Sequence, residues 1–184
     1  MRTIWIYGLI AGAVAAAGIT VTIIASGDAP HSSVWLGYLI MLVALSSIVV
    51  GVKKYRDRQL GGVIRFWPAL QLGLGIAAVA GLAYIAVWET YLFATDYAFM
   101  PAYAEQTLAD KRAAGVNGAA YEKAAAEMAA MVKSYKNPLF RAPMTFIEIF
   151  PVGLVIALMA AWLLKNPRFL PASALSQGEL PRSG

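Results

Sequence analysis

The sequence predicts an all-α membrane protein with four transmembrane helices and with both termini in the cytoplasm. Two observations lead to this prediction: four long apolar segments, and an uneven distribution of lysine and arginine among the segments that flank them. Each apolar segment is close to the ~20 residues that a helix needs to cross a bilayer. The four predicted spans are residues 4–25, 34–52, 67–93 and 146–164.

A chain of 184 residues has room for one domain. We place this membrane domain at residues 1–170. From residue 166 onward the chain is rich in proline and serine, so it is expected to be disordered or nearly so. Residues 171–184 are then a disordered cytoplasmic tail to which no function is attached.

Composition excludes several classes of protein. Hydrophobic residues make up 60% of the chain and charged residues 14%, whereas soluble domains contain about 25% charged residues. The chain has no cysteine and one histidine, His31, so thiolate chemistry and multi-histidine metal sites are excluded. We expect no metal and no cofactor, and the placement of the +5 net charge beside the spans argues against nucleic acid as a partner.

The orientation follows from lysine and arginine, which favour the cytoplasmic side in short loops. The two terminal segments and the loop 53–65 carry nine basic residues against two acidic ones, Asp57 and Glu179, while residues 26–33 carry no basic residue. The five tryptophans all fall at span ends, as an interfacial aromatic belt requires. The nine basic residues are Arg2, Lys53, Lys54, Arg56, Arg58, Arg65, Lys165, Arg168 and Arg182.

The first span also admits a different interpretation. A short basic start, an apolar run and the small residues 15–17 resemble a secretory signal peptide. The run continues for about 22 residues, beyond the usual 7–15 residues of a signal core. Because cleavage would also leave three spans with an outer N-terminus, we expect this segment to remain as a span.

The basic inner loop, residues 53–65, has two compatible interpretations. As a topology anchor with a turn at Gly61 and Gly62, it needs no ligand. As a patch for anionic lipid headgroups, it would gain about 1 kcal/mol per basic residue near the membrane surface. The headgroup patch would consist of Lys53, Lys54, Arg56, Arg58 and Arg65.

Residues 96–137 form a polar, alanine-rich segment that predicts a helical hairpin outside the membrane. Residues 101–114 and 118–135 are rich in helix-forming types, and glycines near residue 115 supply a turn between them. Apolar side chains recur on one face of the second helix. The hairpin is expected to serve as a lid or contact surface, with a solvated spacer as the alternative.

Small residues in the first and third predicted spans favour close approach of helix backbones, which drives packing in lipid. Packing within one bundle and homodimerisation through the first span are both open. The glycines concerned are Gly8 and Gly12 in the first span and Gly73, Gly75 and Gly81 in the third.

Two carboxylates, Glu89 and Glu148, lie at membrane depth, where ionisable groups are costly and mark functional candidates. At a rise of ~1.5 Å per residue, Glu89 lies about 33 Å from Trp67 and Glu148 about 7.5 Å below Pro143. Both therefore fall near the outer surface. If the third and fourth spans are neighbours, the pair could hold a proton, a cation or a buried arginine, for which Arg141 is the nearest candidate.

Each carboxylate also has a structural interpretation. Thr145 and Glu148 fit a capping box at the start of a helix, where a carboxylate also benefits from the helix dipole. Glu89, between Trp88 and Tyr91, fits a solvated residue at the membrane rim.

Five segments of the chain resemble, in the same order, a bacterial family called domain of unknown function 4199. The resemblance runs from about residue 4 to residue 168 and implies a bacterial inner-membrane protein of four helices with no assigned activity. The family's recurrent Tyr-Arg-Asp falls on Tyr55, Arg56 and Asp57, and its acidic span positions fall on Glu89 and Glu148. The five segments are GYLIM (37–41), GVKKYRD (51–57), GGVIRF (61–66), WETY (88–91) and FIEIFPVG (146–153).

These features leave three classes of function to consider: a non-enzymatic membrane component, a transporter and an enzyme. The leading hypothesis is a non-enzymatic component that packs, dimerises or assists a larger complex in the bacterial inner membrane, with lipids as partners. The alternative is a small oligomeric transporter coupled to protons or cations through Glu89 and Glu148, although transporter sites usually lie near the midplane. An enzyme would need an acid, a base and a nucleophile that converge; Asp28 and His31 share a loop beside Pro30 that fits a turn better than a dyad.

Overall fold

The computed structural model describes residues 1–26 and 34–172. In these ranges the protein consists of helices without any strand, so the all-α prediction is confirmed. The helices are α1 (Arg2–Ser26), α2 (Val34–Gln59), α3 (Phe66–Ala94), α4 (Phe99–Ala113), α5 (Gly118–Tyr135) and α6 (Pro138–Leu164).

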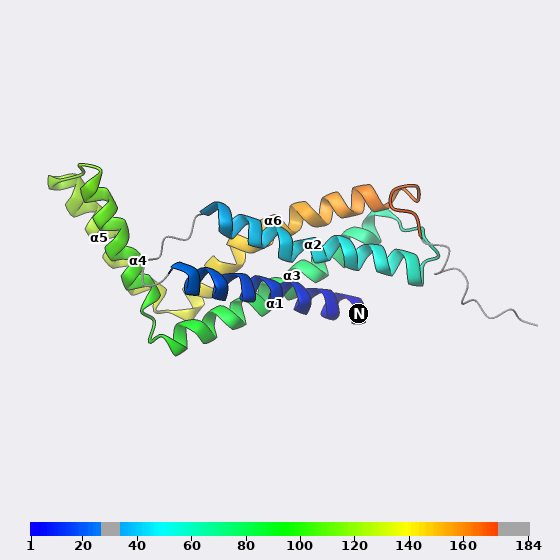
Figure 1. The fold of residues 1–184 in the computed structure, drawn as a ribbon, viewed down its shortest axis with the longest axis horizontal. Helices are drawn as coiled ribbons and strands as arrows, with labels where there is room; N and C mark the ends of the chain where they lie inside the picture. The colour runs from blue at the N-terminus through cyan, green and yellow to red at the C-terminus, as the bar shows by residue number, and fades with distance from the viewer. Residues whose placement is uncertain (27–33, 173–184) are drawn as a thin grey trace, which may run out of the picture.

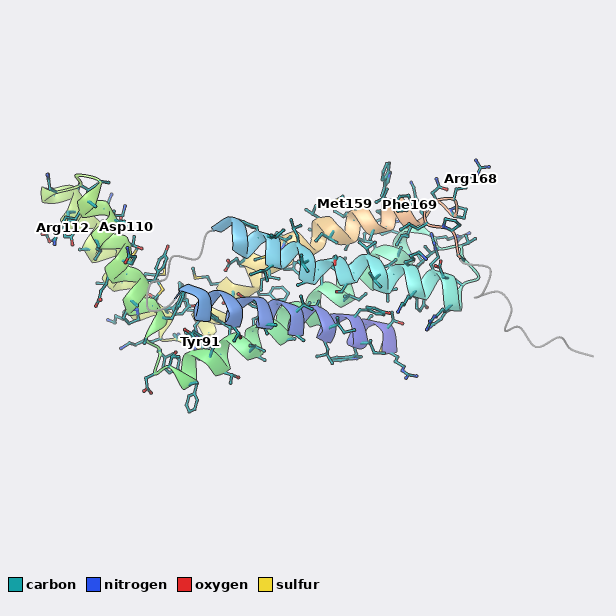
Figure 2. All side chains as sticks on the ribbon, in the orientation of Figure 1. Tyr91, Asp110, Arg112, Met159, Arg168 and Phe169 are labelled. Carbon is teal, nitrogen blue, oxygen red and sulfur yellow. The ribbon has the colours of Figure 1, made fainter. Side chains whose placement is uncertain are left out.

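Helices α1, α2, α3 and α6 pack lengthwise into a bundle (Figure 1). Helix α3 contacts all three others, and α2 contacts both α1 and α6. The start of α1 and the end of α6 lie at one end of the bundle, whereas α4 and α5 lie at the other end (Figure 1). Apolar side chains face outward along the bundle, as Met159 of α6 does in Figure 2.

The interior of the bundle is built largely from small residues. Ala77, Ala157 and Ala161 are almost inaccessible, and five glycines let the backbones approach. A β-carbon at Gly12, for example, would lie 2.5 Å from the β-carbon of Ala83, so this face of α1 is occupied by α3 within the same chain. The glycine contacts are Gly8 with Val79, Gly12 with Ala83, Gly73 with Ala157, Gly75 with Ile4 and Gly81 with Phe146.

Three segments among the described residues are long and apolar enough to cross a membrane: Gly37–Gln59, Phe66–Ala94 and Pro138–Leu164. Within α1, Arg2–Gly18 is a shorter apolar helix. The helix that contains the last predicted span begins at Pro138, earlier than residue 146, because Asn137 caps it: its Oδ1 accepts the amide of Leu139 at 3.0 Å.

This early start excludes the capping box expected at Thr145 and Glu148. Thr145 lies inside α6, and its Oγ1 donates to the carbonyl of Arg141, one turn earlier, at 3.0 Å. The sequence pattern is that of a cap, but a stronger helix-start signal lies upstream, where Asn137 is followed by Pro138.

Helices α4 and α5 occupy the two segments predicted to be helical, contact each other and extend beyond the end of the bundle (Figure 1). We call this pair of helices the arm. Asp110 and Arg112 lie on it, far from Arg168 and Phe169 at the opposite end of the molecule (Figure 2). The predicted tail, residues 171–184, lies outside the described residues except for residues 171 and 172.

Candidate functional site

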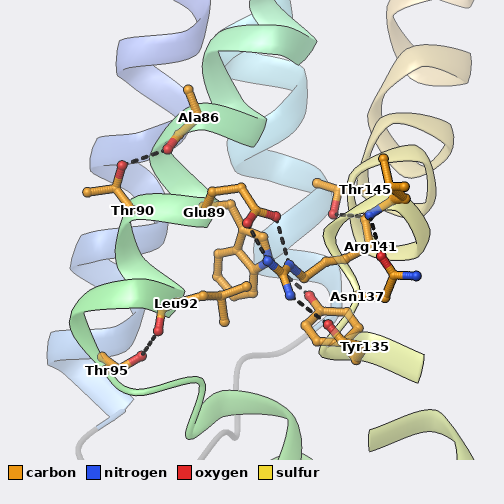
Figure 3. A network of polar contacts seen from close by, with 11 residues as sticks. Ala86, Glu89, Thr90, Leu92, Thr95, Tyr135, Asn137, Arg141 and Thr145 are labelled. Carbon is orange, nitrogen blue, oxygen red and sulfur yellow. Dashed lines mark hydrogen bonds and ion pairs between the residues drawn. The ribbon is translucent and has the colours of Figure 1, made fainter. Parts of the chain in front are cut away.

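The candidate site is an ion pair at the base of the arm, between Glu89 of α3 and Arg141 of α6 (Figure 3). Nε of Arg141 donates to Oε1 of Glu89 at 2.7 Å, and Nη2 donates to Oε2. The Arg141 side chain is 1% exposed and that of Glu89 is 30% exposed. This two-pronged geometry is the strong form of an arginine–carboxylate contact.

The position of Arg141 follows from the register of α6. The residues of α6 that are buried recur every fourth position from Arg141 through Thr145, Ile149 and Gly153 to Ala157. Side chains at this spacing share one helix face, and glycine–alanine contacts bring that face of α6 against α3. Arg141 is the first member of this row and the charged one, so its guanidinium is directed toward α3.

The arm and the turn before it supply further partners for the guanidinium. Nη1 of Arg141 donates to the main-chain carbonyl of Tyr135, the last residue of α5, at 2.6 Å. Carbonyls at a helix C-terminus lack partners within the helix and attract positive charge. The guanidinium carbon also lies 5.1 Å from the ring centre of Tyr97 and 5.6 Å from that of Tyr135, within cation–π range.

Trp88, the residue next to Glu89, joins α3 to both helices of the arm. Its indole Nε1 donates to the phenol oxygen of Tyr135 at 2.9 Å. Its ring packs edge-on against Phe99 of α4 at 4.9 Å and stacks on Tyr91 at 5.3 Å. Burial raises the pKa of the Tyr135 phenol above its ordinary value, so the phenol keeps its proton to a more alkaline pH than a tyrosine in water.

A tight turn between α3 and α4 completes the base of the arm. Asp96 and Tyr97 adopt left-handed backbone angles, with φ of 49° and 58°, which are uncommon for residues other than glycine. The amide of Tyr97 donates to the carbonyl of Leu92 at 2.8 Å, and the hydroxyl of Thr95 donates to that of Tyr91 at 2.9 Å. These bonds hold the turn in the conformation that puts the Tyr97 ring over Arg141.

Glu148 stands apart from this ion pair. It is exposed on α6 and belongs to none of the ion pairs found in residues 1–26 and 34–172. It lies close enough to Tyr84 and Tyr135 to interact with them electrostatically. The structure therefore brings together Glu89 and Arg141, and leaves Glu148 outside their ion pair.

The five basic residues of the inner loop fall into different environments. Arg56 is fully buried, and Lys53 pairs with Asp57 at 2.5 Å. Lys54 is exposed with its Nζ 5.8 Å from the ring centre of Tyr7. Arg58 and Arg65 are also exposed. A headgroup surface would thus rest on three of the five residues, and sequence reasoning did not anticipate the burial of Arg56.

The buried polar side chains of the site already have hydrogen-bond partners within the protein. Within the part of the chain that the structure describes, every buried side-chain nitrogen or oxygen has a hydrogen-bond partner. The same residues contain no cluster of three or more histidine, aspartate or glutamate side chains that could hold a metal ion. The arrangement around Glu89 and Arg141 fastens three helices together.

These features define an all-helical protein with apolar helices long enough to cross a membrane and a polar fastening at the base of a helical arm. The chain belongs to the family described as Protein of unknown function (DUF4199), which matches residues 6–166. The resemblance noted in the sequence is thereby confirmed. No curated protein and no solved structure matches the chain.

Proposed function

We propose that this chain is a four-span protein of the bacterial inner membrane that acts as a non-enzymatic structural or accessory component of a membrane complex. The observation that carries the proposal is the bidentate pair of Glu89 and Arg141, which ties α3 to α6 and, through Tyr135, to the arm. A rigid arm held at the end of a membrane bundle is suited to holding a partner in position.

The four-span topology is part of the proposal. Helix α1 has 25 residues, about 37 Å at 1.5 Å per residue, which is enough to cross the ~30 Å hydrocarbon core. The start of α1, the end of α6 and the loop between α2 and α3 lie at the end of the bundle away from the arm (Figure 1), and the basic residues of these segments, such as Arg2, Lys53 and Arg168, belong to that end. The positive-inside rule then puts that end in the cytoplasm and the arm outside.

The test of this function is the assembly state in native membranes. The chain has no cysteine. Arg112→Cys therefore gives a single thiol on the arm to which a thiol-reactive photo-crosslinker can be attached, and Arg58→Cys gives one at the opposite end as a control. We expect a crosslinked species from the arm and, in mild detergent, a protein mass above that of the 19.7 kDa chain once bound detergent is subtracted. A lone monomer without arm-specific crosslinks would refute the proposal.

One observation favours the second candidate, a transporter coupled to protons or cations. Glu148 is exposed on α6 and stands outside the ion pairs of the described residues. Glu89 is held by Arg141, so a transport role would rest mainly on Glu148. Proteoliposomes that carry the native chain or Glu148→Gln distinguish the candidates: a proton or Na⁺ flux that disappears in the variant supports transport, and the absence of flux from both excludes it.

A further inference from the structure

The structure also describes a short segment after the end of α6. Residues 165–172, which we call the strap, continue from Leu164 and lie at the end of α2. The amide of Phe169 donates to the carbonyl of Asn166 at 3.0 Å, and the amide of Arg168 donates to Oδ1 of Asn166 at 3.0 Å. The strap is bound by a residue far away in the sequence, a contact that the proline- and serine-rich composition from residue 166 onward does not indicate.

That residue is Arg56, near the end of α2, whose side chain is 0% exposed. Its Nη1 donates to the carbonyl of Phe169 at 2.9 Å and lies 3.5 Å from that of Leu164, and its Nη2 donates to the carbonyl of Leu170. Nε donates to Oδ1 of Asp57 at 2.7 Å. All three guanidinium nitrogens are thus occupied, two of them by main-chain carbonyls at and beyond the end of α6.

Arg56 and the strap depend on each other for burial. Leu164 is the last residue of α6, where carbonyls lack partners within the helix and favour a positive charge. A buried guanidinium in turn needs acceptors, because an unpaired buried charge is costly. Asp57, which also binds Lys53, supplies one acceptor, and the strap supplies the others. Opening the strap would leave Arg56 without the main-chain acceptors that bury it.

Two backbone turns, one in the strap and one in the loop after α2, allow the strap to pack against this loop. Leu170 has a left-handed φ of 48°, a conformation that costs free energy unless neighbouring contacts hold it. The loop after α2 turns at Gly62, where a β-carbon would lie 3.3 Å from that of Ala172. The strap therefore lies between Arg56 and this glycine turn, and joins the ends of α2 and α6.

We propose that Arg56 is a latch that controls the opening of the strap. The strap is a unit of local unfolding, distinct from the bundle and from the arm, and it opens when the guanidinium releases the carbonyls of Phe169 and Leu170. This latch fastens the chain at the end of the bundle opposite the Glu89–Arg141 pair. It does not rest on the function proposed above.

Limited trypsin digestion of the purified full-length protein tests the latch. Trypsin cuts after Arg168, which is exposed, only when the surrounding backbone opens. Cleavage at Lys111 and Arg112 on the arm provides an internal reference in the same sample. Mass spectrometry of the fragments over time gives the ratio of strap cleavage to arm cleavage for each variant.

We expect Arg56→Gln to raise this ratio by roughly tenfold or more, because hydrogen bonds to a charged group are lost and cleavage follows the open population. Arg56→Lys should raise it less, since an ammonium keeps the charge but lacks the planar fork. The matched control is Arg58→Gln, two residues away and exposed, which should leave the ratio within about twofold of the native value.

An unchanged ratio in both Arg56 variants would overturn the latch. Should Arg56→Gln prevent folding, the milder Arg56→Lys decides: faster strap cleavage with unchanged arm cleavage supports the latch. If strap and arm cleavage instead accelerate together in Arg56→Lys, Arg56 holds the whole bundle, and a latch specific to the strap is refuted.

Discussion

The guanidinium of Arg141 is held on one side by the carboxylate of Glu89 and on the other by the main-chain carbonyl that ends α5. One side chain of α6 thus binds α3 and the arm at the same time. Because Arg141 is almost fully buried, its charge is stable there only while these partners stay in place.

The ion pair should therefore contribute strongly to stability. Removing one partner of a fully buried pair costs about 3–5 kcal/mol; the partial exposure of Glu89 lowers the expected loss for Arg141→Gln to about 2–4 kcal/mol. Thermal unfolding in detergent measures this loss. Lys136→Gln, an exposed change near the same helix end, is the control and should change stability by less than about 0.5 kcal/mol. Equal melting temperatures for both variants would contradict a stabilising pair.

The hydrogen bond from Trp88 to Tyr135 gives a second prediction. Tyr135→Phe leaves the buried indole N–H without its acceptor, which should cost about 1–3 kcal/mol. Tyr103→Phe, on the exposed surface of α4, should cost almost nothing. Equilibrium unfolding followed by tryptophan fluorescence compares the two variants, and equal stabilities would show that the bond contributes nothing.

The same bond predicts a dependence on alkaline pH. Burial raises the pKa of Tyr135 in the folded protein, so above a pH of about 10 the phenol ionises more readily in the unfolded chain than in the folded one. Stability from this group is complete below that pH and decreases as the pH rises further. The stability difference between the native protein and Tyr135→Phe should therefore shrink above a pH of about 10; a difference that stays constant would contradict this linkage.

Substitution by alanine should affect the stability of the protein differently at two glycines, Gly12 and Gly37. At Gly12 a β-carbon would lie 2.5 Å from that of Ala83, whereas among the described residues no atom lies within 4 Å of one at Gly37. Gly12→Ala should destabilise the bundle by about 1–3 kcal/mol through overpacking. Gly37→Ala should be neutral or stabilising by up to about 1 kcal/mol, because alanine favours the helix. Urea or SDS titration ranks the two, and a more stable Gly12→Ala would disprove the close packing of α1 on α3.

The proposed orientation predicts the side from which single cysteines react. Ala114→Cys lies at the tip of the arm, and Gln59→Cys lies at the end of α2. In intact bacterial cells a membrane-impermeant maleimide should label the first position, and it should label the second only after permeabilisation. The reverse pattern would place the arm in the cytoplasm.

The sequence by itself determined most of the helices. Long apolar runs and alanine-rich segments are local properties, so they predict α1, α3 and both helices of the arm close to their observed bounds, whereas α2 continues to Gln59, beyond the predicted span 34–52. They also singled out Glu89 and named Arg141 as its nearest candidate partner, because charges at membrane depth are rare enough to stand out. The start of α6 was misplaced because hydropathy marks where apolar character begins, whereas the helix begins at the upstream cap, Asn137.

Only the tertiary structure decided which partners the charges have. Glu148 matches Glu89 in residue type and is predicted to lie in a nearby layer, yet it takes no part in the ion pair: it stands seven residues from Arg141, about 10 Å further along α6, where its side chain is exposed. Arg56 reads as one basic residue among five, but it is buried against carbonyls more than a hundred positions away, those of Phe169 and Leu170. Main-chain carbonyls leave no mark in a sequence. The Glu89–Arg141 ion pair and the contacts of Arg56 with the strap are therefore defined only by the packing of the helices.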